Sequence, residues 1–451
     1  MSDLAALVEW MVDYAERHGA HEAEVYFSYS RELEVEISLG QLSSCHLSDE
    51  YGVGLRVIVD GAVGFSFSNS LERRMLEVSV DRAVKAAKAS KPDKRWTGLP
   101  DPRKPTFVSG VFDRRIRNIS EEELVTIART MLDAAEDYSH KVTAYWGVAA
   151  AGYGEVFIAN SRGLNVHGEG TSIGCALGTV AKEGSLISPE CSDFDFKRTY
   201  EVNPEKVGET ASQLAVNSLK RIEVSSGVYP VVLAYPALHA LIEYTFLQAI
   251  TGDNVLRGKS PYAGRIGEQV SSSMISIVDD GRLEGGLNSS PFDGEGVPSQ
   301  KTTIIKKGTL KSFLYDTYWG RVAGAASTGN AIRSSYASTP KVGPSNLIIE
   351  KGSSSFEDLI GEISNGLLVW DVQGAHSSNP ESGEVSVVAT PCWLIRNGNI
   401  ASPVKGLMLA DNFYGMLKRV NGVGDDVKSY SFLVSPSIRF SSVKAVSKSS
   451  G

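Results

Sequence analysis

The sequence predicts an α+β protein with an N-terminal duplicated helix–strands–helix domain, followed by a strand-rich, barrel-like C-terminal domain around a buried helix. Two patterns indicate this fold class. The order helix, several strands, helix occurs twice within residues 1–225, and from residue 226 onward the chain is rich in glycine, serine and β-branched residues. A chain of 451 residues is also too long for one ordinary core, which indicates two or three domains.

The first copy of the repeated unit is expected at about 1–90, and its opening helix is the clearest element. Leu4, Val8, Met11 and Ala15 recur at spacings of three and four, so their side chains share one face of a helix. This stripe of apolar side chains predicts that the helix packs against the strands that follow it.

The strands of the first copy are predicted from alternation. Residues 32–37 alternate glutamate with apolar residues, so one face of the strand is expected to be buried and the other solvated. Residues 53–59 alternate up to Asp60-Gly61, a dipeptide typical of a two-residue hairpin turn. A return strand over 63–67 and a helix over about 71–89 complete the unit.

The second copy is expected at about 120–222, after a linker over 91–119 that is rich in proline and arginine. Ser120 and Glu123 form a capping box at the start of its first helix, and Asn203-Pro204 opens its last helix. Three strands are predicted between these two helices, near 142–149, 154–160 and 164–180.

The C-terminal domain is expected over 226–451. Its helix at about 236–250 is apolar on almost every side, which predicts burial at the centre of the domain. Thr302–Ile305 and Leu310–Leu314 are predicted to form a hairpin around Lys307-Gly308. Further short elements are predicted as strands at Val385–Val388, Cys392–Ile395 and Phe432–Val434, and as helices near 355–365 and 412–421.

Composition and charge exclude several function classes. The formal net charge of −8 and the pI of about 5.6 give no electrostatic footprint for nucleic acid. No window of 18 apolar residues predicts a transmembrane helix, and Met1-Ser2-Asp3 does not resemble the start of a signal peptide. The four cysteines form no C-x-x-C pair. We therefore expect a cytoplasmic protein with reduced thiols that binds neither a membrane nor nucleic acid directly.

The histidines are scattered and form no metal-binding motif. His18 and His21 flank a predicted helix end at Gly19, and Cys45 and His46 are adjacent in a strand, which directs them to opposite faces. Zinc ligands must converge on one point, so neither pair is interpreted as a metal site. The chain also lacks a G-x-x-x-x-G-K-[ST] phosphate loop and a G-x-S-x-G nucleophile elbow.

Two polar residues interrupt the apolar helix predicted at 236–250. Glu243 and Gln248 are expected in a dry environment, where each of them needs a hydrogen-bond partner. Two interpretations remain open at this point. The residues are either groups that make structural hydrogen bonds or the remnants of an active site.

Short motifs recur through the C-terminal half in one order and spacing. They are Thr251-Gly252-Asp253, Val278–Gly281, Asp293–Pro298, Lys307-Gly308, Ser327–Ala331, Pro344–Leu347, Gly366–Val369, Ser382–Val385, Pro403-Val404, Asp411-Asn412, Gly422–Asp425 and Ser435–Ile438. Each motif alone is weakly specific, but the ordered set is very specific. On these residues the chain resembles the TldD/PmbA family over essentially its whole length, most strongly in 228–440.

The resemblance implies a heterodimeric zinc peptidase. The TldD-type subunit carries H-E-x-x-x-H on the helix before a Gly-Asp pair, a cysteine near the C-terminus as a third ligand, and a glutamate that activates the zinc-bound water. Counting back from Gly252-Asp253, the two histidine positions fall on Glu243 and Gln248, and the glutamate position falls on Tyr244. Residues 425–432 contain no cysteine. The chain therefore resembles a PmbA/TldE-type subunit without the zinc motif, and we assign it no catalytic residue and no metal ligand.

The resemblance also implies a cleft that takes flexible or unfolded peptides by largely sequence-independent main-chain pairing. The turn Ser327-Thr328-Gly329-Asn330 is a candidate lining of this cleft, because its backbone and hydroxyl donors are expected to be free. The alternative is that this turn only shapes a loop.

The leading hypothesis is a non-catalytic subunit that binds no cofactor itself, helps to degrade flexible peptides and pairs with a zinc-bearing TldD-type partner. Two alternatives stay open. One is a stand-alone hydrolase with an unrecognised site, and the other is a non-enzymatic, peptide-binding homodimer.

Overall fold

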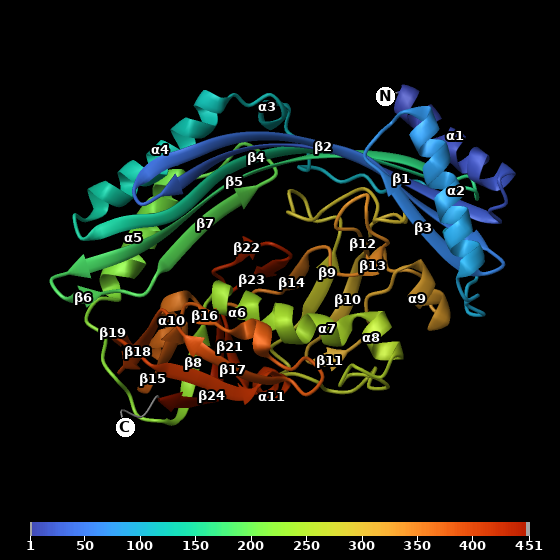
Figure 1. The fold of residues 1–451 in the computed structure, drawn as a ribbon. Coiled ribbons are helices and arrows are strands. Elements are labelled where there is room, and N and C mark those ends of the chain that lie inside the picture. The colour runs from blue at the N-terminus through green and yellow to red at the C-terminus, as the bar shows by residue number, and fades with distance from the viewer. Residues whose placement is uncertain (1, 448–451) are drawn as a thin grey trace.

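The N-terminal half of the chain forms one long, curved sheet, and the C-terminal half lies on the concave side of that sheet (Figure 1). The computed structural model describes residues 2–447, so Met1 and the last four residues of the predicted C-terminal domain lie outside the described part. Helices are interspersed among mostly antiparallel strands, so the predicted mixture of helices and strand-rich sheets is confirmed.

The curved sheet has seven strands in the order β3-β2-β1-β4-β5-β6, with β7 also paired to β5. Its strands are β1 Glu22–Ser38, β2 Gln41–Val59, β3 Ala62–Ser68, β4 Val142–Asn160, β5 Asn165–Glu183, β6 Leu186–Ile187 and β7 Cys191–Lys197. The antiparallel pair β1–β4 joins the two predicted copies into this single sheet. The strand order mirrors itself about that pair, and the duplication itself stays a prediction.

The second copy departs from the prediction at its first strand. The strands expected near 142–149 and 154–160 are one continuous strand, β4. Gly152 and Gly154 do not make a turn, because they pair with Glu32 and Ser30 of β1 and so remain within the ladder. The two glycines led to the prediction of a break between two strands. Pairing of β4 with β1 on one side and β5 on the other keeps the strand extended through them.

Helices cover the convex face of the sheet in two pairs (Figure 1). The helices of this half are α1 Ser2–Arg17, α2 Arg73–Ala89, the short α3 Arg114–Arg117, α4 Glu121–Tyr138 and α5 Pro204–Asn217. The apolar stripe of α1 packs on the alternate residues Ala23, Val25 and Phe27 of β1, and the predicted capping box of Ser120 and Glu123 is confirmed. The residues between them in β1, such as Glu24 and Tyr26, face the concave side.

The C-terminal half contains a six-stranded sheet, ordered β11-β10-β9-β14-β23-β22, a nine-stranded sheet, ordered β16-β17-β20-β24-β8-β15-β18-β19 with β21 on β24, and the small pair β12-β13. The strands are β8 Gly227–Leu233, β9 Ile277–Asp280, β10 Lys301–Lys306, β11 Thr309–Leu310, β12 Ala331–Ile332, β13 Lys341–Val342, β14 Leu347–Ile349, β15 Asn365–Val369, β16 Val372–Gln373, β17 Glu384–Ala389, β18 Cys392–Arg396, β19 Asn399–Pro403, β20 Leu407–Asn412, β21 Val420–Val423, β22 Lys428–Tyr430, β23 Leu433–Ser435 and β24 Ile438–Ser447. The short helices are α8 Gly252–Leu256, α9 Thr317–Val322, α10 Phe356–Gly361 and α11 Phe413–Lys418, with a 3₁₀ turn at Ala375–Ser377.

One helical segment runs through the core between these two sheets (Figure 1). It consists of α6 Tyr235–Leu241, a π-helical turn at Ile242–Phe246 and α7 Leu247–Ile250. Side chains from both sheets pack on it, which confirms the predicted apolar helix at the centre of this domain. We call Tyr235–Ile250 the core helix.

Glycines let the two halves approach closely. A Cβ atom on Gly54 of β2 would collide with the main-chain oxygen of Tyr336, and one on Gly168 of β5 would press on the ring of Phe292. The linker lies in the same interface, where Arg321 of α9 donates to its carbonyl oxygen at Leu99 (3.2 Å). The concave face of the sheet is therefore a docking surface for the C-terminal half and is not solvated throughout.

Candidate functional site

An open cleft of about 830 Å³ lies between the concave face of the sheet and the C-terminal half. The sheet contributes β1, β4 and β5, including the glycines at 152, 154, 168 and 170. The C-terminal half contributes the core helix through Glu243 and Leu247, together with loops around 287–294 and 329–333. The cleft is thus walled by segments that are far apart in the sequence.

The core helix has one open face, and this differs from the prediction of burial on almost every side. Ile242, Phe246 and Ile250 are fully buried, whereas Tyr244 is 39% exposed and Gln248 is exposed. Glu243 is half-buried, which raises the pKa of its carboxyl group. The dry environment expected for Glu243 and Gln248 is therefore wrong, because the sheets cover only part of the helix surface.

The π-helical turn brings onto this open face the three positions on which the TldD motif was predicted to fall. In an α-helix, residues five apart point about 140° away from each other. Here the N–H of Leu247 donates to the carbonyl of Ile242, an i→i+5 bond that widens the turn. Glu243 and Gln248 consequently lie on the same side, together with Tyr244. No pattern in the sequence predicted this widened turn.

His239 lies on the same helix but faces the core. It is 8% exposed, and its ring packs against Tyr430 and Phe432 at centroid distances of 4.5 and 4.8 Å. Its Nε2 atom is buried without a hydrogen-bond partner, and its Nδ1 atom lies 3.8 Å from Glu243 Oε2. Burial lowers the pKa of His239 to about 4, so the imidazole is neutral at pH 7.

The donors on the open face do not fit a zinc ion. Gln248 Oε1 accepts a hydrogen bond from Asn254 (2.9 Å), and the ring of Tyr244 packs edge-on toward His376. Glu243 is then the remaining carboxylate, and one carboxylate cannot supply the three or four ligands that zinc requires. Within residues 2–447, no group of three or more His, Cys, Asp or Glu side chains is arranged to hold a metal ion.

The turn predicted to line the cleft uses its donors internally. Thr328 Oγ1 accepts from the N–H of Tyr315 (2.8 Å) and lies 2.6 Å from Asn330 Oδ1. Asn330 donates to buried Asp279 (2.7 Å), and Ser327 Oγ accepts from the N–H of Gly329 (3.1 Å). The expectation of free hydroxyl donors is therefore wrong, and of these four residues Gly329 alone lines the cleft.

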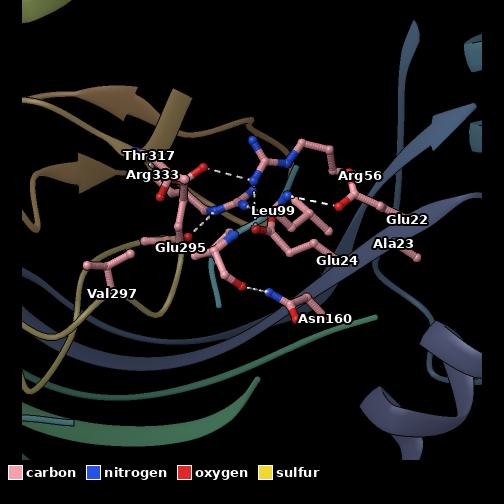
Figure 2. Close-up of polar contacts among 12 residues, drawn as sticks. Glu22, Ala23, Glu24, Arg56, Leu99, Asn160, Glu295, Val297, Thr317 and Arg333 are labelled. Atoms are coloured by element: carbon pink, nitrogen blue, oxygen red, sulfur yellow. Dashed lines mark hydrogen bonds and ion pairs between the residues drawn. The ribbon is translucent and has the colours of Figure 1, made fainter. Parts of the chain in front are cut away.

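A buried network of four charged side chains fixes one wall of the cleft (Figure 2). Arg56 of β2 donates to Glu24 of β1 (2.7 Å) and to Glu295 of the C-terminal half (2.9 Å). Arg333, which lines the cleft, is paired with the other oxygen of Glu24, and Glu295 also accepts from the N–H of Thr317 (2.9 Å). We call Glu24, Arg56, Glu295 and Arg333 the buried ion network.

The charges in this network balance each other. Burial alone would lower the pKa of Arg56 and raise that of Glu295, but their mutual attraction reverses both shifts, with Glu24 adding to the effect on Arg56. Arg56 and Glu295 therefore stay charged in a dry interface. Sequence reasoning missed the network because the polar face of β1 was expected to be solvated, and the partners are more than 200 residues apart.

Models of three domains from one family match the chain. The PmbA/TldA metallopeptidase C-terminal domain matches residues 226–447, domain 1 matches 23–90 and the central domain matches 114–219. The chain belongs to the PmbA/TldD metallopeptidase family. The resemblance inferred from the ordered motifs is thereby confirmed.

Relatives in this family carry the names PmbA and TldD. An uncharacterized protein of Methanocaldococcus jannaschii is 33% identical over 435 residues, which is 96% of this chain and 98% of the relative. In Haemophilus influenzae, a metalloprotease PmbA homolog is 25% identical over 98% of this chain and 96% of the relative, and a metalloprotease TldD homolog is 25% identical over 89% and 85%.

Solved structures of PmbA/TldD proteins share this fold. The crystal structure of TldE from Thermococcus kodakarensis superposes with a TM-score of 0.93 at 29% identity, covering 98% of this chain and all of that one. Among residues 2–447, no helix combines the length and apolarity that crossing a membrane requires.

Replacing Arg56 by methionine should destabilise the protein by about 3–5 kcal/mol, because buried Glu295 would lose the guanidinium that it pairs with and Glu24 would keep only Arg333. The measurement is the urea midpoint of unfolding. Arg162→Met is the matched control, since its pair with Asp101 is exposed and contributes about 0–1 kcal/mol. Equal midpoints for the two variants would contradict the structural role of the network.

The buried imidazole should make stability depend on pH. The pKa of His239 is lower in the folded state than in the unfolded chain, so its contribution to stability is present above pH 6.5 and is lost as the pH falls toward 4. Between pH 7 and 5 this loss amounts to about 2 kcal/mol. His239→Phe should reduce the pH dependence of the urea midpoint, whereas the exposed His376→Phe should keep it. An unchanged slope for His239→Phe would contradict a neutral, buried imidazole.

Proposed function

We propose that this chain is the non-catalytic, zinc-free subunit of a heteromeric metalloprotease of the TldD–TldE type, and that it binds and presents flexible polypeptides to a zinc-bearing TldD-type partner. One observation carries the proposal. The open face of the core helix presents Glu243, Tyr244 and Gln248 at the positions where the TldD pattern has His, Glu and His, and Glu243 of these three lines the cleft.

The geometry of the core helix suits a metal site better than its side chains do. The TldD pattern spaces its two histidines five residues apart, and the π-helical turn at Ile242–Phe246 puts residues with that spacing on one face. In this chain the imidazole nearest to the motif, on His239, instead packs under Tyr430 and Phe432. We expect a helix of this shape without zinc ligands in a subunit whose partner carries out the catalysis.

The cleft has the features that sequence-independent polypeptide binding needs. Its volume of about 830 Å³ is at the upper end of the range for ligand pockets, and it is open to solvent. Glycines on β4 and β5 form part of its wall without projecting side chains into it. Main-chain contacts do not read side chains, so such a cleft suits varied, unfolded segments.

The partnership is supported by the relatives. Haemophilus influenzae has one relative named as a PmbA homolog and another named as a TldD homolog, and both match this chain over most of its length. Two chains of one fold, one with and one without the zinc motif, would form the expected heteromer.

The purified chain should contain far less than one zinc per molecule and should not cleave an unfolded polypeptide such as reduced casein. Addition of a TldD-type subunit from the same organism should produce cleavage, and a chelator should abolish it. The measurements are elemental analysis and release of peptides over time. One tightly bound zinc per chain together with cleavage by the chain alone would contradict the proposal, and metal-independent cleavage would indicate a stand-alone hydrolase.

A further inference from the structure

Half of strand β2 has a partner on only one side. β3 pairs with β2 over Val53–Val59, whereas β1 pairs with β2 along almost its entire length. Within the described residues, no strand or loop makes a backbone hydrogen bond to the outer side of residues 41–51. We call residues 41–51 the open edge of β2.

The open edge presents a row of unpaired main-chain groups. Val59 closes the hairpin with Ala62, so the N–H and C=O groups of Val59 point toward β3, and those of Ile58 point toward β1. Continuing this alternation along β2, the groups of Tyr51, Asp49, Leu47 and Cys45 point away from β1 into the open side. Such a row is a template for one more strand.

The corresponding edge of the second copy is already covered by an extended segment of the chain. β5 lies beside β4 as β2 lies beside β1, and β7 pairs only with its residues 173–179. On the uncovered part, the N–H of Thr171 donates to the carbonyl of Val111 in the linker (3.0 Å), and Thr171 Oγ1 accepts from the N–H of Asp113 (2.9 Å). The protein therefore shows on β5 what kind of segment such an edge accepts.

The charges around the open edge favour a basic occupant. Residues 30–51 of β1 and β2 carry five carboxylates, on Glu32, Glu34, Glu36, Asp49 and Glu50, against the single arginine Arg31. A second copy of this chain would bring the same excess of negative charge, which opposes pairing of two such edges. An extended segment rich in lysine or arginine would be attracted instead.

The open edge borders the cleft. Ser30 and Glu32 line the cleft, and they pair with Glu50 and Ser48 of β2. A strand added to β2 at this point would lie two strand spacings, about 10 Å, from the cleft-lining residues of β1. The edge can therefore hold a polypeptide next to the place where the proposed function needs it.

From this geometry we propose that the open edge of β2 binds an extended, basic polypeptide segment by adding it to the sheet as an eighth strand. Affinity comes from the main-chain groups of the odd-numbered residues 45–51, and the carboxylates on β1 and β2 select for lysine and arginine. The inference rests on the proposed function in that the bound segment is substrate, but its binding requires neither zinc nor a partner subunit. If no peptide binds to the open edge, the proposed role as a subunit is unaffected.

The first test measures binding of a fluorescein-labelled peptide of about ten alternating lysine and threonine residues to the full chain by fluorescence anisotropy. Leu47→Pro removes an outward N–H group without breaking a bond to β1, so it should weaken binding by about tenfold or more. Ile400→Pro is the matched control, because Ile400 is exposed on the edge strand β19, next to the hairpin-closing pair Asn399–Arg396, and its N–H also points outward. Equal affinity for Leu47→Pro and the wild type would overturn the proposal.

The second test uses Cys45, which lies in the middle of the open edge and is exposed, whereas Cys175, Cys191 and Cys392 are buried. The bound peptide should slow alkylation of Cys45 in the wild-type chain by about fivefold or more, since the added strand would cover this edge. Glu34→Lys should weaken both the protection and the affinity, most strongly at low salt. An alkylation rate unchanged by saturating peptide would overturn the proposal, as would full protection of Cys45 by a TldD-type subunit without peptide, which would mark the edge as a subunit interface.

Discussion

The buried ion network of Glu24, Arg56, Glu295 and Arg333 is the constraint on which the rest of the structure depends. It joins two neighbouring strands of the N-terminal sheet to two loops of the C-terminal half, and each of its side chains is at most 7% exposed. Moving charged side chains out of water costs several kcal/mol per ion. We therefore interpret the network as fixing the position of the C-terminal half against the sheet rather than as adding net stability. Its geometry fixes how far the C-terminal half stands from the concave face, and thereby sets the width of the cleft.

At this cleft, the core helix has a shape that suits a metal site, but its side chains are not those of the TldD motif. The core helix lies at one wall with a π-helical turn, and this turn gathers residues 243, 244 and 248 on the open side of the helix, from which Glu243 lines the cleft. None of these side chains is an imidazole or a thiolate, and His239 is instead part of an aromatic core. Under the proposed function, the fold keeps the surroundings of a peptidase site in a chain that lacks the ligands of the TldD pattern, and the cleft serves to bind polypeptides.

Local patterns in the sequence predicted much of the fold, and long-range contacts accounted for the errors. Alternation, capping and turn dipeptides depend on neighbouring residues, so the hairpin at Asp60-Gly61 and the start of α4 at Ser120 were predictable. The continuity of β4 was not, because it depends on pairing on both sides of Gly152. For the same reason, the pairing of Glu24 with Arg333 and the open face around Gln248 had no signal in a single sequence.

The sequence allowed a prediction about the site only through the zinc ligands that it lacks. The ordered motifs identified the family, and the missing histidines identified the subunit type that the chain resembles. The most direct test is anomalous diffraction at the zinc edge from crystals of this chain in complex with a TldD-type subunit. We expect one zinc peak per heterodimer, in the partner, with none beside Glu243, Tyr244 and Gln248. A zinc peak on the core helix of this chain would contradict the account.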